Sequence, residues 1–225
     1  MYPLRYMVVG LLLGFSNVAI ACDMPDIGPE IFCGKYRAEP KTSFYKIQGQ
    51  LATFEKFEDV KELIQTLPKD EAMRNKYNWE TTSPPVIRVV EERLNVEVAT
   101  AYIVAIAHED DRDYHVIISD RPTSAGASFM NVEVSGLPRN GVDNDDFARA
   151  RDEIRPISQL PSDCDGDSSY KQVCPPVKVT VKGSVFFDGA HDAHDPNCAN
   201  CPGPPWAKPR TAWEIHPVFD IQTLQ

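Results

Sequence analysis

Long apolar runs are absent from this chain of 225 residues after residue 15. A helix that crosses the ~30 Å hydrocarbon core of a bilayer needs about 20 apolar residues, and the run at 7–15 is shorter than that. Basic runs are absent as well, because 23 lysines and arginines face 33 acids and the net charge is -10. Proteins that bind duplex nucleic acid neutralise phosphates with lysine and arginine. The composition therefore predicts that duplex nucleic acid is not a partner.

Several catalytic signatures are also missing. The chain holds no Gly-x-Ser-x-Gly elbow, no phosphate-binding glycine loop and no His-Glu-x-x-His helix. Each of these motifs places a nucleophile, a phosphate or a zinc ion in a fixed geometry. Their absence argues against the enzyme classes that depend on them.

The first residues are typical of an export signal. Arg5 precedes the apolar run 7–15, and the small-residue pattern Ala19-Ile20-Ala21 follows. This order predicts a signal peptide over residues 1–21 and a periplasmic or extracellular location. Residues 19–22 also loosely resemble a bacterial lipobox, so the alternative to a freely diffusing protein is a lipid anchor on Cys22.

Six cysteines in an exported chain favour disulfides, because the compartment is oxidising. Proximity along the chain predicts neighbouring pairs, which are Cys22–Cys33, Cys164–Cys174 and Cys198–Cys201. The alternative is a zinc site that uses Cys164, Cys174, Cys198 and Cys201. Its irregular intervals and the oxidising compartment make it the weaker hypothesis.

Hydrophobic spacing divides the rest of the chain in two. Apolar residues repeat at helical spacing over 57–67, and 69–77 adds a second short helix. We therefore expect an N-terminal extension over 22–85, with one or two helices and disulfide staples.

From residue 86 onward, alternating apolar and polar residues predict strands. They cover 96–107, 114–119, 129–135, 177–187 and 213–221, and a helix over 144–157 separates the third from the fourth. This is the order of an OB-fold, a small five-stranded barrel. The predicted fold is mainly β with a few helices, an OB-fold-like barrel over 86–225 behind the helical extension.

All five histidines lie at or after residue 108, and four of them sit beside acids near the ends of predicted strands. Imidazole and carboxylate bind metals and move protons, so these residues are the candidate chemistry. Since side chains two apart on a strand share a face, Glu214 and His216 should point away from Trp213 and Ile215. In the same way, His115 could face Glu133 across a strand pair.

The metal hypothesis assigns a divalent ion such as zinc to His115, Asp188, His191, Glu214 and His216, with Asp113 and Glu133 as supporting acids. The alternative is that these residues form structural hydrogen bonds at the ends of the barrel. His108 and His194 are expected in exposed loops. Trp206, among prolines, is expected to cover the barrel, with a binding loop as the alternative.

Three segments resemble a family of exported, mostly uncharacterised bacterial proteins. They are Tyr114-His115, the stretch Phe186-Phe187-Asp188 followed by His191, and Glu214-Ile215-His216-Pro217-Val218. The likeness covers roughly residues 86–221, and the insert at 192–210 and Lys182 depart from it. The resemblance implies export and a small barrel but supplies no activity.

Two functions remain open. The first is a non-enzymatic binding module of the cell envelope, with an envelope or extracellular ligand of unknown identity. The second is a metal-dependent hydrolase that uses the histidine and acid cluster.

Overall fold

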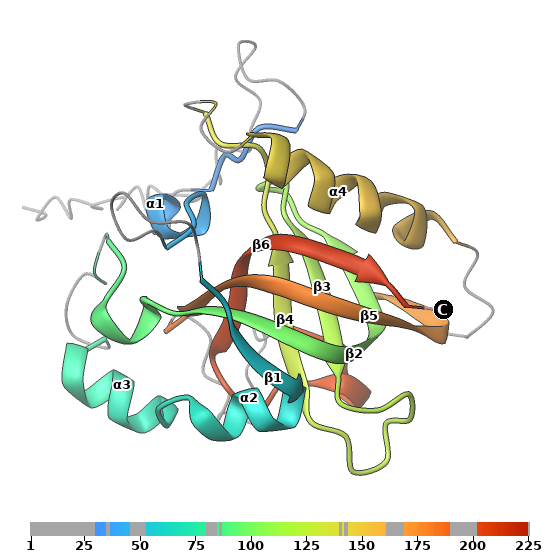
Figure 1. Ribbon diagram of the computed structural model, residues 1–225, viewed down its shortest axis with the longest axis horizontal. Helices are drawn as coiled ribbons and strands as arrows, with labels where there is room; N and C mark the ends of the chain where they lie inside the picture. The colour runs from blue at the N-terminus through green and yellow to red at the C-terminus, as the bar shows by residue number, and fades with distance from the viewer. Residues whose placement is uncertain are drawn as a thin grey trace, which may run out of the picture.

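The computed structural model describes residues 30–34, 37–45, 53–79, 85, 87–139, 141, 144–160, 169–189 and 202–224 (Figure 1). The predicted signal peptide lies outside these ranges, as do Cys22, Cys164, His191, His194, Cys198 and Cys201. In the described part of the chain, no helix has the length and apolar character needed to span a bilayer.

A closed barrel of five strands forms the centre of the molecule, as predicted. Around the barrel the order is β2 (Asn95–His108), β3 (Tyr114–Ser119), β4 (Phe129–Val134), β6 (Trp213–Thr223) and β5 (Lys171–Phe187), and β5 pairs again with β2. Neighbouring strands are antiparallel except β4 and β6, which run parallel. The prediction of a mainly β fold with few helices is confirmed.

A sixth strand, β1 (Glu55–Asp59), was not predicted. It pairs in parallel with the first half of β2 and buries Phe57, which the sequence had placed in a helix. The helix α2 (Val60–Thr66) begins only after Asp59, whose side chain accepts a hydrogen bond from the Glu62 amide at 2.9 Å. Such a cap satisfies a free amide of the first turn, so the strand ends and the helix begins at this residue.

Helices close the two ends of the barrel (Figure 1). Helices α2 and α3 (Asp70–Tyr77) lie below it in the figure, and α4 (Asn144–Gln159) lies above it. Leu63, Met73 and Ile154, one from each helix, belong to the same apolar core as the barrel strands. The apolar core thus extends from the barrel strands onto all three helices. A short helix, α1 (Ala38–Lys41), precedes these elements and lies near β6.

Each barrel strand sends alternate side chains into this core. On β6, Trp213 and Ile215 belong to the core and Glu214 and His216 do not, as predicted. All five barrel strands contribute to the core, so the side of each strand that carries the core residues faces the interior of the barrel. The residues between them, including His216, point outward.

The two cysteines within the described ranges, Cys33 and Cys174, are in the disulfide-bonded form. The cysteines predicted to pair with them lie outside the described residues. The disulfide-stapled extension and its pairings therefore stay predictions.

Gly183 marks the tightest crossing of β5 over β6. A Cβ at this position would lie 2.5 Å from Ile215 Cγ2 and 2.5 Å from the Pro217 carbonyl oxygen. Because one of these atoms is backbone, Gly183→Ala should lower the free energy of unfolding by about 1–3 kcal/mol. Urea unfolding measures this change in free energy, and Lys178→Ala on the same strand is the control. An unchanged value for Gly183→Ala would show that the strands separate easily.

Candidate functional site

Polar side chains gather on the outward face of β3, β4 and β6. His115 and Glu133 are register partners on β3 and β4, and His115 Nε2 lies 3.0 Å from Glu133 Oε1. The predicted encounter of these two residues is confirmed. His115 Nδ1 lies 3.2 Å from the Tyr170 hydroxyl, so both ring nitrogens have a polar neighbour.

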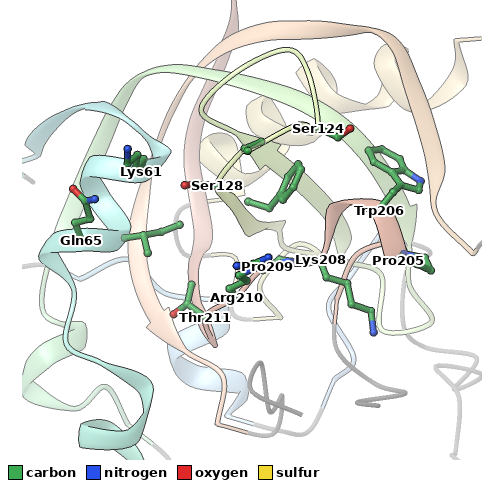
Figure 2. A pocket seen from close by; sticks show the side chains of 14 residues that line it. Lys61, Gln65, Ser124, Ser128, Pro205, Trp206, Lys208, Pro209, Arg210 and Thr211 are labelled. Atoms are coloured by element: carbon green, nitrogen blue, oxygen red, sulfur yellow. The ribbon is translucent and has the colours of Figure 1, made fainter. Parts of the chain in front are cut away.

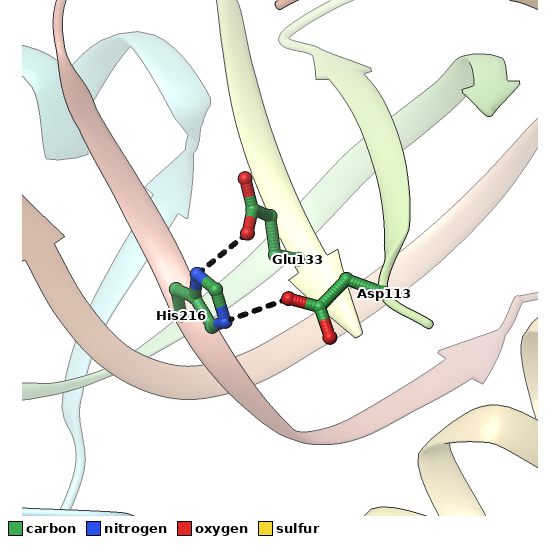
Figure 3. Close-up of side chains that lie close together, drawn as sticks. All are labelled: Asp113, Glu133 and His216. Atoms are coloured by element: carbon green, nitrogen blue, oxygen red, sulfur yellow. Dashed lines mark ion pairs between the residues drawn. The ribbon is translucent and has the colours of Figure 1, made fainter. Parts of the chain in front are cut away.

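His216 on β6 lies between two carboxylates (Figure 3). Its Nδ1 is 2.7 Å from Glu133 Oε2, and its Nε2 is 3.5 Å from Asp113 Oδ2. Asp113 precedes β3, and its Oδ1 accepts a hydrogen bond from the Gly136 amide at 2.7 Å. The ring therefore links the start of β3 to β4 through two acids.

Asn131 joins β4 to β6 within the same group. Its Nδ2 donates to Glu133 Oε1 at 2.8 Å and to Glu214 Oε1 at 3.0 Å. Asn131 and Glu214 are register partners in the parallel pair. Asn131 was not among the predicted site residues, although its place two residues before Glu133 puts it on the same face.

Lys41 of α1 covers the acids from outside the barrel. Its Nζ lies 3.6 Å from Glu133 Oε2 and 3.8 Å from Asp188 Oδ2. Asp188, just after β5, thus joins the group through Lys41. Lys41 could not be predicted as part of this group, because a lone lysine in a segment without a clear pattern gives no signal of a buried partner.

We call Lys41, Asp113, His115, Asn131, Glu133, Asp188, Glu214 and His216 the buried network. Asp113, Glu133 and His216 are 0% exposed. Asp113 Oδ2, Glu133 Oε2 and both ring nitrogens of His216 make no hydrogen bond of acceptable geometry within the described residues. The His216–Glu133 approach at 2.7 Å is thus a close ion pair rather than an aligned hydrogen bond.

The pKa values of these groups follow from their burial and from the charges close to them. Burial lowers the pKa of His216, but the carboxylates of Glu133 and Glu214 together outweigh burial and raise it to about 9. The same balance raises the pKa of His115 to about 10. Burial raises the pKa of Asp113 to about 7, against the opposing charge of His216. For Glu133, burial is outweighed by His115, Lys41 and His216, and its pKa lies well below the ordinary value.

The network could also hold a metal ion. Ligand atoms of Asp113, Glu133 and His216 lie within 4.8 Å of one another, and this is the group with metal-ligand spacing in the described part of the chain. Two carboxylates and an imidazole suit zinc and similar ions. Binding would require His216 to lose its proton first, so metal and proton compete for this site.

The structure brings together most of the residues that the metal hypothesis named. His115, Glu214 and His216 lie in the network, and Asp188 contacts it through Lys41. Asp113 and Glu133, predicted as supporting acids, are at its centre. His191 lies outside the described residues. His108 is exposed, as expected, but it is the last residue of β2 rather than part of a loop, and it packs against the Tyr114 ring with centroids 4.7 Å apart.

A separate pocket of about 700 Å³ opens between α2, the loop after β3 and the segment 205–211 (Figure 2). No member of the buried network lines it. Trp206 stands at its rim and is 37% exposed, while the adjacent Ala207 is buried against the outer face near Ile117. The segment therefore both covers the barrel and presents an aromatic ring to solvent.

Comparison with protein-family models, with curated proteins and with solved structures finds no match to this chain. The family resemblance drawn from the strand motifs therefore stays a prediction. What the site can do has to be argued from its own geometry.

Removing the charge of Glu133 tests how much this charge contributes to the stability of the fold. Glu133→Gln keeps the size of the side chain but leaves three buried cations without their main counterion. We expect a loss of about 3–5 kcal/mol in the free energy of unfolding, measured with urea at pH 7.

Glu97→Gln is the matched control, because Glu97 pairs with Lys56 and Lys182 on a partly exposed strand surface. Its loss should be about 0–1 kcal/mol. Equal losses in the two variants would mean that the buried carboxylate stabilises the fold no more than the partly exposed one.

The raised pKa values predict the pH dependence. His216 and Asp113 hold protons more tightly when folded, so unfolding releases protons and stability falls as pH rises. The contribution of His216 is complete below its unfolded pKa of about 6.5 and is lost as pH passes about 9.

Unfolding free energies at pH 6.5 and pH 9 should therefore differ more in the parent than in His216→Gln. His108→Gln should keep the parent's difference, because His108 lies outside the network. The same difference in all three proteins would contradict this assignment.

Proposed function

We propose that this protein is a non-enzymatic binding module of the cell envelope, built on an OB-fold barrel that the buried network braces. Three features support the fold: the order β2-β3-β4-β6-β5, the parallel β4–β6 pair and the helix α4 between β4 and β5. Such barrels bind ligands on their outer surface and in their loops.

The complete burial of Asp113, Glu133 and His216 carries the proposal. A hydrolytic metal site keeps one coordination position open to substrate and water. Asp113, Glu133 and His216 are 0% exposed, and the cations around them already balance much of their charge. This arrangement suits a structural role and does not favour the alternative of a metal-dependent hydrolase. Ligand binding then belongs to another surface, and the pocket beside Trp206 is open to solvent.

A structural metal ion is the second candidate for the network. The observation in its favour is the spacing of the Asp113, Glu133 and His216 ligand atoms. A closed site is typical of structural rather than catalytic zinc. Glu214 could complete the ligand set, since its Oε2 lies 3.6 Å from His216 Nδ1.

Location and partners are part of the same proposal. The signal-like start supports a periplasmic or extracellular protein, and Cys22 would be the attachment point if a lipid anchor is present. The acidic net charge of -10 supports a partner other than duplex nucleic acid.

Metal content and turnover together test the proposal. The parent, His216→Ala and the exposed-histidine control His108→Ala are purified from the periplasm without chelator. Each is assayed for bound metal and, with and without added Zn²⁺, for hydrolysis of p-nitrophenyl phosphate and p-nitrophenyl acetate. We expect no turnover by any of them, and a lower melting temperature for His216→Ala alone.

Hydrolysis that disappears in His216→Ala but survives in His108→Ala would overturn the non-enzymatic function. Stoichiometric metal that is lost in His216→Ala but kept in His108→Ala, in proteins that hydrolyse neither substrate, would instead establish the structural metal centre.

A further inference from the structure

The pocket beside Trp206 differs in charge from the rest of the protein. Its fourteen lining residues include the cations Lys61, Lys208 and Arg210 and no acid. The whole chain carries 33 acids against 23 lysines and arginines. A positive pocket on an acidic protein concentrates small anions that the remaining surface repels.

The cations come from two sides of the pocket. Lys61 lies on α2, and Arg210 lies in the segment that leads into β6 (Figure 2). Within the described residues neither forms an ion pair, and both are exposed. Their charges are therefore available to a ligand placed between them.

Aromatic surface lies beside these charges. Trp206 and Phe129 line the pocket, and Trp206 makes no ring contact within the described part of the chain. The other two tryptophans, Trp79 and Trp213, are 7% and 1% exposed. Covering an exposed indole with a flat apolar group is favourable, because both apolar surfaces are removed from water.

Two acids hold lining residues without lining the pocket themselves. Asp70 is buried and accepts hydrogen bonds from the Thr211 hydroxyl at 2.8 Å and from the Ala212 amide at 2.7 Å. Asp120 Oδ1 accepts a hydrogen bond from the Ser128 amide at 2.8 Å, and its Oδ2 pairs with Arg121 at 3.0 Å.

We propose that this pocket binds a small organic anion in which an aromatic ring adjoins a phosphate, sulfate or carboxylate group. The anion would lie between Lys61 and Arg210, with the ring against Trp206. The volume of about 700 Å³ falls within the range of ~300–1,000 Å³ typical of small-molecule sites. The inference rests on the proposed binding function and specifies its ligand.

Isothermal titration calorimetry of the full-length protein with 1-naphthyl phosphate tests the inference. Inorganic phosphate supplies the anion without the ring, and 1-naphthol supplies the ring without the anion. We expect 1-naphthyl phosphate to bind at least about tenfold more tightly than either, a difference of about 1.4 kcal/mol. Its affinity should fall when salt rises from 50 to 500 mM, because the charges are exposed.

Variants locate the site. Lys61→Gln with Arg210→Gln, and separately Trp206→Ala, should each weaken 1-naphthyl phosphate at least about tenfold. The matched control is Lys69→Gln with Arg93→Gln, which removes the same charge from exposed positions outside the pocket. The control should bind as the parent does, and equal melting temperatures would show that all variants are folded.

Each contrary result has a distinct meaning. If 1-naphthol binds as tightly as 1-naphthyl phosphate, the ligand needs no anionic group and the inference is overturned, but the protein is still a binding module. Equal binding of phosphate overturns the role of the ring, and unchanged binding in the pocket variants or no binding in the parent overturns the inference. Release of fluorescent 1-naphthol from 1-naphthyl phosphate would instead contradict the non-enzymatic function.

Discussion

The charge on Glu133 is the constraint on which the other features of the network depend. A carboxylate at 0% exposure is stable only where cations and hydrogen-bond donors replace water. His115, His216 and Lys41 supply the cations, each from a different element, and Asn131 donates a hydrogen bond. One acid thus ties α1, β3 and β6 to β4.

The two polar regions differ in their access to solvent. The buried network lies on the outward face of the strands, yet Asp113, Glu133 and His216 at its centre are 0% exposed, so their charges act on one another. The pocket beside Trp206 has exposed cations and an exposed ring, so its groups act on solvent or a ligand. In a binding module, this separation lets the recognition surface vary without disturbing the barrel.

The sequence predicted the barrel because its strands alternate. Val132 and Val134 with Glu133 between them, and Ile215 with Glu214 and His216 around it, identify both faces without a structure. Local spacing could not reveal β1, because Phe57 continues the helical repeat and Asp59 alone marks the break. Nor could it reveal Lys41 or the pocket. Lys61 and Arg210 are far apart in the chain, and only the folded barrel places them around one cavity.

The parallel seam between β4 and β6 has a consequence for exchange with solvent. Its backbone register covers two pairs, Asn131↔Glu214 and Val132↔Ile215, and the Asn131 side chain extends the join. Short pairings open more readily than long ones during local fluctuations. The seam has the fewest register pairs of the barrel and includes the strand that carries Glu133, so a local opening there would bring solvent to the strand on which the buried charge sits.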